Sequence, residues 1–280
     1  DALPISEDAP LMRPHLLPGL LEAAKRNYGR GFKDFALFEM GLIFRKSIDL
    51  KPGIFPETGK RPPAATIKEI FESVPTQLSF ICGVQIGHVE SESWKGKARS
   101  YQWSDAVGEV EKILGQMNLE WTVKRSDLAP WHPGRCAEFI VNGTPVAHAG
   151  ELHPRVIADF GLPARSTAWG INLDALPVSP LVTPKPITVM PAAVQDLALV
   201  VSSSVPSQDV KDAVVAGAGE LLESITLFDR YEAIGDGKVS LAFSLVFRAA
   251  DRTLTAAEVS GFRDAAAAEA AKRVGASVRG

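Results

Sequence analysis

The 280-residue chain lacks an excess of positive charge. Its 30 Lys and Arg residues stand against 33 Asp and Glu residues, which gives a net charge of −3, and basic residues do not outnumber acidic ones in either half. A protein that binds nucleic acid mainly through a general basic surface is therefore excluded, because such binding draws its affinity from many phosphate contacts. A local contact directed at bases remains open.

Long hydrophobic runs and cysteines are scarce as well. Apolar runs such as LALVV at residues 197–201 are far shorter than the roughly 20 residues that a membrane-spanning helix needs. The first residues, DALPISEDAP, lack the basic head and apolar stretch of a secretory signal. The two cysteines, Cys82 and Cys136, match no metal-binding spacing and are too few for a disulfide framework. We expect a soluble, cytoplasmic protein that binds no metal, contacts no membrane and keeps two buried, reduced thiols.

The composition that is present, with 46% hydrophobic and 22% charged residues, is typical of a globular, core-forming protein. A proline-rich stretch, ALPVSPLVTPKP at residues 175–186, has no apolar periodicity and is typical of a semi-rigid spacer. It predicts a first domain over residues 1–175, a linker over 176–186 and a second domain over 187–280. A second break, KPGIFPETGKRPPAAT at residues 51–66, predicts a long surface loop inside the first domain.

The first domain mixes helices and short apolar strands. Asn142-Gly143 lies between two apolar segments and predicts a hairpin, because both residues accept the positive φ angles of a type I′ turn. The other expected elements follow from periodicity and capping residues: a helix over 16–28, strands over 34–44 and 77–87, and a helix over 104–117 with Ser104 as its N-cap.

The second domain has a simpler pattern. Its expected elements are strands over residues 196–201, 224–234 and 238–248, helices over 206–222 and 255–274, and a closing strand at 276–279. Thr255 and Glu258 have the spacing of a capping box at the start of the second helix. The order β-α-β-β-α-β predicts a ferredoxin-like domain. The whole chain is thus expected to be an α+β protein.

The segment WHPGRCAEFIVNGTPVAHAGELHPRV, residues 131–156, raises the question of an active site. Three of its residues are His132, His148 and His153, but they have neither the spacing nor the helix of a zinc site. No serine stands in a GxSxG motif, and Cys136 has no assignable base. We therefore expect structural roles: HPGR as a tight turn that enters the hairpin, and GELHP as a strand end followed by a helix that starts at proline.

Several strings together resemble a known family. LMRPHLLPGLLEAAKRN, KDFALFEMGLIF, HPGRCAEF, GELHPRV and FDRYEAIGDGKVSLAFSLVFRAADRTLTAAEV occur in order across nearly the whole chain. They resemble the C-terminal part of the β subunit of bacterial phenylalanyl-tRNA synthetase. The resemblance implies a domain shaped like a class II synthetase core, built on an antiparallel sheet, followed by a ferredoxin-like anticodon-binding domain.

The resemblance also implies that the core-like domain has lost catalysis and serves assembly. Leu37, in LFE, stands where a working core would hold the ATP phosphate with arginine, and no Gly-x-Gly-x-Glu-Arg string supplies the second arginine. We expect no catalytic residue and no cofactor in this chain. In the family, ATP and Mg²⁺ act through the catalytic α subunit, two α and two β subunits form the enzyme, and tRNA(Phe) is the RNA partner. We expect this chain to be a fragment that lacks the upstream editing part.

Strand alternation predicts which side chains of the second domain face away from the helices. With Leu197 and Phe228 inward, the open face receives four residues, and the resemblance implies that this face binds a base of the tRNA anticodon: Ala198, Asp229, Tyr231 and Ser240. Arg248 and Arg252 are candidate contacts to the tRNA backbone. Gln195 stands where the family usually has arginine, which removes one expected phosphate contact.

A second class of function remains as an alternative. Ferredoxin-like domains of the ACT type bind small molecules in regulatory proteins, and a fold alone does not decide function. Such domains usually bind their ligand at a glycine-containing first loop. Here that loop, VSSSVPS at residues 201–207, contains no glycine, which disfavours the regulatory interpretation.

Overall fold

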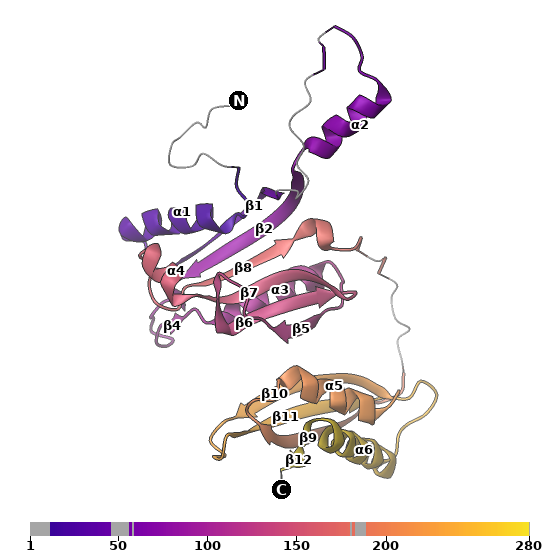
Figure 1. Cartoon of the computed structure of the whole chain (residues 1–280). Coiled ribbons are helices and arrows are strands. Elements are labelled where there is room, and N and C mark those ends of the chain that lie inside the picture. Colours follow the sequence, from indigo (N-terminus) through magenta and orange to yellow (C-terminus); the bar gives the residue numbers. More distant parts are fainter. Residues whose placement is uncertain (1–11, 46–55, 58, 180, 183–188, 280) are drawn as a thin grey trace. The chain divides into compact units, whose positions relative to one another are not determined.

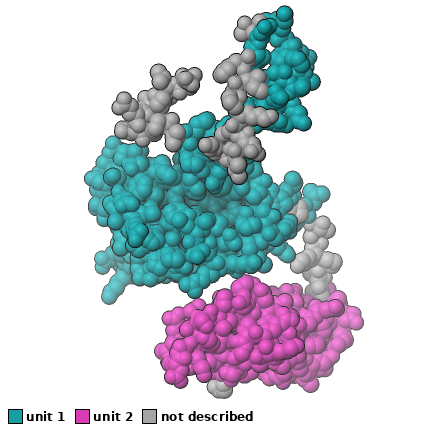
Figure 2. Space-filling model, in the orientation of Figure 1, with its two compact units in different colours: residues 1–182 teal, residues 183–280 magenta. Residues whose placement is uncertain are grey.

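The computed structural model describes residues 12–45, 56–57, 59–179, 181–182 and 189–279. The chain divides into two compact units, residues 1–182 and 183–280 (Figure 2). Residues 51–55 and 58 of the expected surface loop at 51–66 and residues 180 and 183–186 of the expected linker at 176–186 lie outside the described residues, and the end of the expected loop is the start of a helix, Ala64–Ser73. Within the part that the structure describes, no helix is long and apolar enough to cross a membrane.

Unit 1 is built on an antiparallel six-stranded sheet with the order β1-β2-β8-β7-β6-β5 (Figure 1). Its strands are β1 Phe35–Arg45, β2 Thr76–Ile86, β5 Thr122–Arg125, β6 Trp131–Val141, β7 Thr144–Leu152 and β8 Thr167–Asn172. A separate two-stranded sheet joins β3 His88–Glu90 to β4 Arg99–Ser100. The helices are α1 Leu17–Gly29, α2 Ala64–Ser73, α3 Trp103–Gln116 and α4 Pro154–Asp159, with a 3-10 turn at Leu173–Ala175.

Helices α1 and α3 cover opposite faces of this sheet. The buried side of α1 packs against Cys82, Val84 and Ile86 of β2, whereas the buried side of α3 packs against residues of β6, β7 and β8, including Trp169 and Ile171. Because strand neighbours alternate between faces, the two helices generate two separate apolar layers. The apolar spacing of the sequence predicted α1, β1, β2 and α3 within two residues of their bounds.

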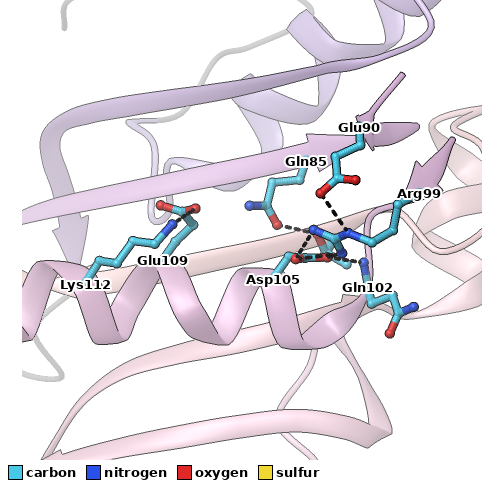
Figure 3. Close-up of polar contacts among 8 residues, drawn as sticks. Gln85, Glu90, Arg99, Gln102, Asp105, Glu109 and Lys112 are labelled. Atoms are coloured by element: carbon cyan, nitrogen blue, oxygen red, sulfur yellow. Dashed lines mark hydrogen bonds and ion pairs between the residues drawn. The ribbon is translucent and has the colours of Figure 1, made fainter. Parts of the chain in front are cut away.

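The start of α3 differs from the expectation. Its N-cap is Gln102 and not Ser104, and the Asp105 carboxylate accepts a hydrogen bond of 2.7 Å from the Gln102 N–H. Arg99 donates to both oxygens of that carboxylate at 3.0 and 3.1 Å, so the cap is held from β4 (Figure 3). A carboxylate at N3 satisfies a free helix N–H group, which outweighs the preference of serine for the N-cap position.

The hairpin predicted at Asn142-Gly143 is confirmed, since φ is 48° at Asn142 and 78° at Gly143. The HPGR segment is not a turn before the hairpin. It lies within β6 as an irregular stretch, because Trp131 pairs with Leu152 and the regular register resumes only at Cys136 with Gly150. Helix α4 starts at a proline, as expected. Helix α2 was not anticipated from the sequence.

Unit 2 is an antiparallel four-stranded sheet with the order β10-β11-β9-β12. Its elements are β9 Ala193–Ser202, α5 Ser207–Ala218, β10 Leu222–Tyr231, β11 Lys238–Phe247, α6 Ala256–Val274 and β12 Ser277–Val278, which confirms the β-α-β-β-α-β order (Figure 1). The capping box of Thr255 and Glu258 is present at the start of α6. Both helices pack on one face, where they share one apolar core with alternate residues of β9 and β11.

Candidate nucleic-acid interface

The candidate interface is the face of the unit 2 sheet that the helices leave uncovered. On β9, Leu197, Leu199 and Val201 are buried against α5 and α6, so Ala198 points to the other face. On β11, Leu241 and Phe243 are buried in the same core. This alternation is the one expected from the sequence.

Strand register brings the four predicted residues together in two adjacent rows. Asp229 pairs with Ala242, which pairs with Ala198 on its other side. Tyr231 pairs with Ser240 in the next row of the same face. Directly paired residues in neighbouring strands have Cβ atoms about 5 Å apart and share a face of the sheet. Ala198, Asp229, Tyr231 and Ser240 therefore form one contiguous surface, which we call the open-face site.

A β-bulge in β10 corrects one step of the sequence argument. Phe228 was expected to point inward, but its side chain is 56% exposed. The register shifts between Leu227, which pairs with Phe243, and Asp229, which pairs with Ala242, so Phe228 is the extra residue of the bulge. The sequence argument was therefore wrong about Phe228, although it placed Asp229 and Tyr231 on the face where the structure has them.

The members of the open-face site differ in exposure. Tyr231 is 43% exposed and offers an aromatic ring to a flat partner, while Asp229 is exposed and offers a carboxylate. Ser240, which pairs with Tyr231, is only 3% exposed and lies low on the sheet surface. Ala198 and Ala242, in the same row as Asp229, have small side chains that leave space above the sheet beside the Asp229 carboxylate. An aromatic ring beside an acceptor and a flat floor suits a single-stranded base, which is commonly stacked and hydrogen-bonded at its edge.

Arg279 belongs to this surface and was missed in the sequence. Its guanidinium carbon lies 5.1 Å from the centre of the Tyr231 ring, and its backbone N–H donates to the Ala198 carbonyl at 2.9 Å. This distance is within the range of a cation–π contact. Ser277 pairs with Val200, so strand parity places Arg279 on the open face. The alternation of β12 was the signal that could have identified it.

The two candidate backbone-contact arginines already have acidic partners. The Arg248 Nε donates to Glu223 at 2.8 Å and its Nη1 to the Met190 carbonyl at 2.7 Å. Arg252 lies 2.8 Å from Glu258, and this pairing is the first of several interactions that lower the pKa of Glu258 to about 2. A phosphate at either arginine would compete with a carboxylate, and both assignments remain predictions.

Gln195 faces the helices and not the open-face site. Its side-chain oxygen accepts a hydrogen bond of 3.1 Å from Arg263 of α6. The Gln195 side-chain amide is thus engaged with α6 on the helix side of the sheet.

Two polar pairs in the histidine-rich segment of unit 1 join neighbouring strands. Arg135 of β6 donates to both carboxylate oxygens of Glu151 at 2.9 and 3.0 Å, and Glu151 is 5% exposed. His148 lies 3.2 Å from Glu138 in the neighbouring strand. Among the described residues, no group of three or more His, Cys, Asp and Glu side chains could hold a metal ion. The segment therefore ties β6 to β7.

Comparison with protein-family models divides the chain at the same place as its structure. Residues 2–173 match the model described as "Phenylalanyl tRNA synthetase beta chain CLM domain". Residues 188–279 match the model described as "Ferredoxin-fold anticodon binding domain". The second match includes all four residues of the open-face site and Arg279.

Curated relatives agree with these matches. The phenylalanine-tRNA ligase β subunit of Streptomyces avermitilis is 45% identical over 284 residues, which cover 99% of this chain and 34% of that protein. The β subunit of Thermobifida fusca is 43% identical over 100% of this chain and 34% of its own length. That of Corynebacterium efficiens is 42% identical over 99% and 33%. The chain spans about a third of the length of these relatives.

Proposed function

This chain belongs to the family of phenylalanine-tRNA ligase β subunits, and on that premise we propose that it binds the anticodon of tRNA(Phe) and supports assembly with the catalytic α subunit. The single observation that carries the first role is the open-face site, where Tyr231 and Asp229 meet Ser240 and Ala198 on a sheet face that no helix covers. Tyr231 stacks on one base, and Asp229 accepts a hydrogen bond from that base.

The ACT-like alternative lacks comparable support. The second unit matches the anticodon-binding family model, and its first loop contains no glycine. Acidic residues outnumber basic ones over residues 187–280, so phosphate contacts in other parts of the enzyme supply most of the affinity for tRNA. This unit contributes base recognition.

The test of the anticodon site is Tyr231→Ala in the assembled ligase. Stacking of a base on one aromatic side chain contributes roughly 1 to 3 kcal/mol, so tRNA(Phe) binding should weaken roughly tenfold to a hundredfold. Filter binding with wild-type tRNA and with tRNA altered at each anticodon base measures the loss. The variant should lose discrimination at one anticodon position only.

Two further variants serve as controls. Tyr231→Phe keeps the ring and should bind nearly as well as the wild type, whereas Ala198→Phe fills the space beside the ring and should weaken binding about as much as Tyr231→Ala. An equal loss at every anticodon position, or no loss with Tyr231→Ala, would contradict the assignment.

The assembly role rests on an exposed apolar strip on β1, the edge strand of the unit 1 sheet. Phe38 is 72%, Met40 68% and Leu42 43% exposed, and all three alternate on the face that α3 leaves uncovered at this edge. We call these three residues the β1 strip. Exposed apolar patches of this kind mark protein interfaces. Arg13 accepts from the Phe44 N–H and donates to the Leu42 carbonyl on the outer edge of β1, so the case for an interface rests on the apolar side chains.

Helix α1 offers no comparable apolar surface. Its apolar residues Leu17, Leu20, Leu21 and Ala24 are buried against the sheet. The outward side of α1 carries charged residues such as Glu22, Lys25 and Arg26. Helix α1 therefore stabilises unit 1 itself.

The whole enzyme is proposed to be cytoplasmic, with two α and two β subunits, and to bind ATP and Mg²⁺ through its α subunits. This chain alone then activates no amino acid, because Leu37 packs with the apolar layer beneath α1 and supplies no cation to a phosphate. ATP–pyrophosphate exchange that depends on phenylalanine, catalysed by the pure chain above background, would refute this part of the proposal.

A further inference from the structure

A second candidate site lies in unit 1, on the α1 side of the sheet beyond the area that α1 covers. It is a cavity of about 330 Å³, and its polar and aromatic lining residues are His15, Arg45, Phe80, Trp131, His148 and Asn172. Gly170 and Ala147 contribute to the lining and carry little or no side chain. The volume lies at the lower end of the range of small-molecule sites in proteins.

The imidazole of His15 presents an unused donor. Its Nδ1 accepts a hydrogen bond of 3.0 Å from the Leu17 N–H, which places the proton of the neutral ring on Nε2. The Nε2–H has no hydrogen-bond partner among the described residues. Burial, followed by the charges of Arg45 and His148, lowers the pKa of His15, which favours the neutral ring.

His148 offers the opposite kind of group. Its Nε2 lies 3.2 Å from a carboxylate oxygen of Glu138, so the neutral ring donates from Nε2 and leaves Nδ1 as an acceptor. Burial is the main reason for the lowered pKa of His148, although Glu138 opposes it. Asn172 accepts from the Asp174 N–H at 3.2 Å, and its amide NH₂ group has no acceptor among the described residues.

Arg45 gives the cavity its charge. Among the described residues its guanidinium has no acidic partner, and no Asp or Glu side chain lines the cavity. Arg45 and His15 both line the cavity. A positive charge in the lining favours an anion, and a planar guanidinium suits carboxylate and phosphate groups.

Aromatic rings form flat parts of the cavity wall. The Trp131 and His148 rings stack with their centres 5.6 Å apart at an angle of 25°, and Trp131 is fixed by a 3.0 Å hydrogen bond from its Nε1–H to the Ala168 carbonyl. Phe80 lies 6.0 Å from the His15 ring. Rings held in this way line a slot that a planar apolar group can fill.

We propose that this cavity binds a small organic anion with a flat apolar body, whose carboxylate or phosphate group pairs with Arg45. The body lies against Trp131 and Phe80, and His15 donates a hydrogen bond to the anionic group. The inference adds a ligand site to unit 1 and restores no ligase chemistry. It is also independent of the anticodon proposal, because all of its residues belong to unit 1.

The test is isothermal titration of the 280-residue chain with phenyl phosphate, benzoate, inorganic phosphate and the uncharged benzamide. We expect phenyl phosphate or benzoate to bind at least about tenfold more tightly than benzamide, because a charge-assisted hydrogen bond is stronger than a neutral one. The comparison of phenyl phosphate with benzoate decides which anionic group the site prefers. The difference in affinity between phenyl phosphate and inorganic phosphate measures the contribution of the flat apolar body to binding.

Variants locate the binding. Arg45→Met removes the charge from an exposed side chain and should weaken anion binding about tenfold or more. Arg26→Met removes an exposed charge of α1 that does not line the cavity, and it should bind like the wild type. In nuclear magnetic resonance spectra, the Trp131 indole and His15 ring signals should shift on binding, whereas the indole of Trp94, which is 91% exposed and outside the cavity, should not.

Several outcomes would overturn the proposal. They are no binding of either aromatic anion at tens of millimolar, equal binding of benzamide, inorganic phosphate binding as tightly as phenyl phosphate, or equal losses in Arg45→Met and Arg26→Met. If Arg45→Met changes the amide spectrum of unit 1, His15→Asn replaces it. Asn can still accept from the Leu17 N–H but has no donor at the imidazole Nε2 position, so an unchanged affinity in that variant would also count against the site.

Discussion

At the scale of single residues, the hydrogen-bond partners of a charged side chain decide whether it can serve a ligand, and Arg135 and Glu151 are an example. A buried carboxylate is costly unless it is paired, and here the guanidinium of Arg135 makes two hydrogen bonds to Glu151. Arginine and glutamate are common in active sites, but these two side chains bind each other. Tyr231 and Asp229, in contrast, are exposed beside each other on the open-face site.

The two thiols should be unreactive in the folded chain. Burial is the main cause that raises the pKa of Cys82 to about 12 and that of Cys136 to about 11, and the thiolate is the reactive form. At pH 8 a thiol reagent should modify neither residue quickly, and two equivalents should react after denaturation without reductant. Fewer than two reactive groups in the denatured chain would contradict the structure.

The neutral histidines of the cavity should make stability depend on pH. Burial lowers the pKa of His15 and His148 in the fold, so the unfolded chain binds more protons as the pH falls through about 6.5. The free energy of unfolding should therefore decrease from pH 7.5 to pH 5.5. Replacement of His15 by Asn, which keeps an acceptor for the Leu17 N–H, should make this decrease smaller in urea titrations. An unchanged pH dependence in His15→Asn would show that His15 does not contribute.

At the scale of elements, α5 and α6 depend on a glycine at their contact. A Cβ atom added at Gly217 would lie 2.7 Å from the Ala265 carbonyl oxygen and 2.7 Å from the Ala266 Cα. The glycine that weakens α5 as an isolated helix thus permits its close approach to α6. Packing between elements outweighs the local propensity of this residue.

Gly217→Ala should destabilise unit 2 by roughly 1 to 3 kcal/mol, because the added methyl group meets backbone atoms that cannot rotate away. Gly261→Ala, in α6, has open space around the new Cβ and should stabilise the unit by up to about 1 kcal/mol. All five tryptophans precede residue 170, so native-state hydrogen exchange of α5 and α6 is the suitable measurement. Equal changes in the free energy of unfolding for Gly217→Ala and Gly261→Ala would contradict a tight contact at Gly217.

At the scale of the whole molecule, the two units present surfaces of different chemistry. Unit 1 exposes the apolar β1 strip, and unit 2 exposes an open sheet face with an aromatic ring, a carboxylate and a guanidinium. Basic residues do not outnumber acidic ones in either unit, so neither has the excess of cations that would hold RNA without help. A part that recognises one base and docks on a larger assembly fits this distribution.

The double substitution of Phe38 and Met40 by Gln should weaken assembly with the catalytic α subunit while unit 1 stays folded, because both side chains are exposed in the isolated chain. Co-purification and hydrogen exchange over residues 35–45 measure the effect. Trp94→Gln is the control, since this side chain is exposed outside the strip. Normal assembly of the double variant would show that the α subunit binds elsewhere.

The sequence by itself determined most helices and strands, because their signals are local. Apolar spacing identified α1, α3, β9 and β11, and the capping box of Thr255 marked the start of α6. Period-2 alternation was also enough to place Ala198 and Ser240 on one face of a sheet.

Only the tertiary structure decided features that join distant segments. The β-bulge at Phe228 depends on the pairing of β10 with β11, and the position of Arg279 over Tyr231 depends on the order of strands between them. The cavity around Arg45 gathers residues from segments more than a hundred positions apart. No local pattern encodes such neighbours, because they are fixed by which strands pair and which faces the helices cover.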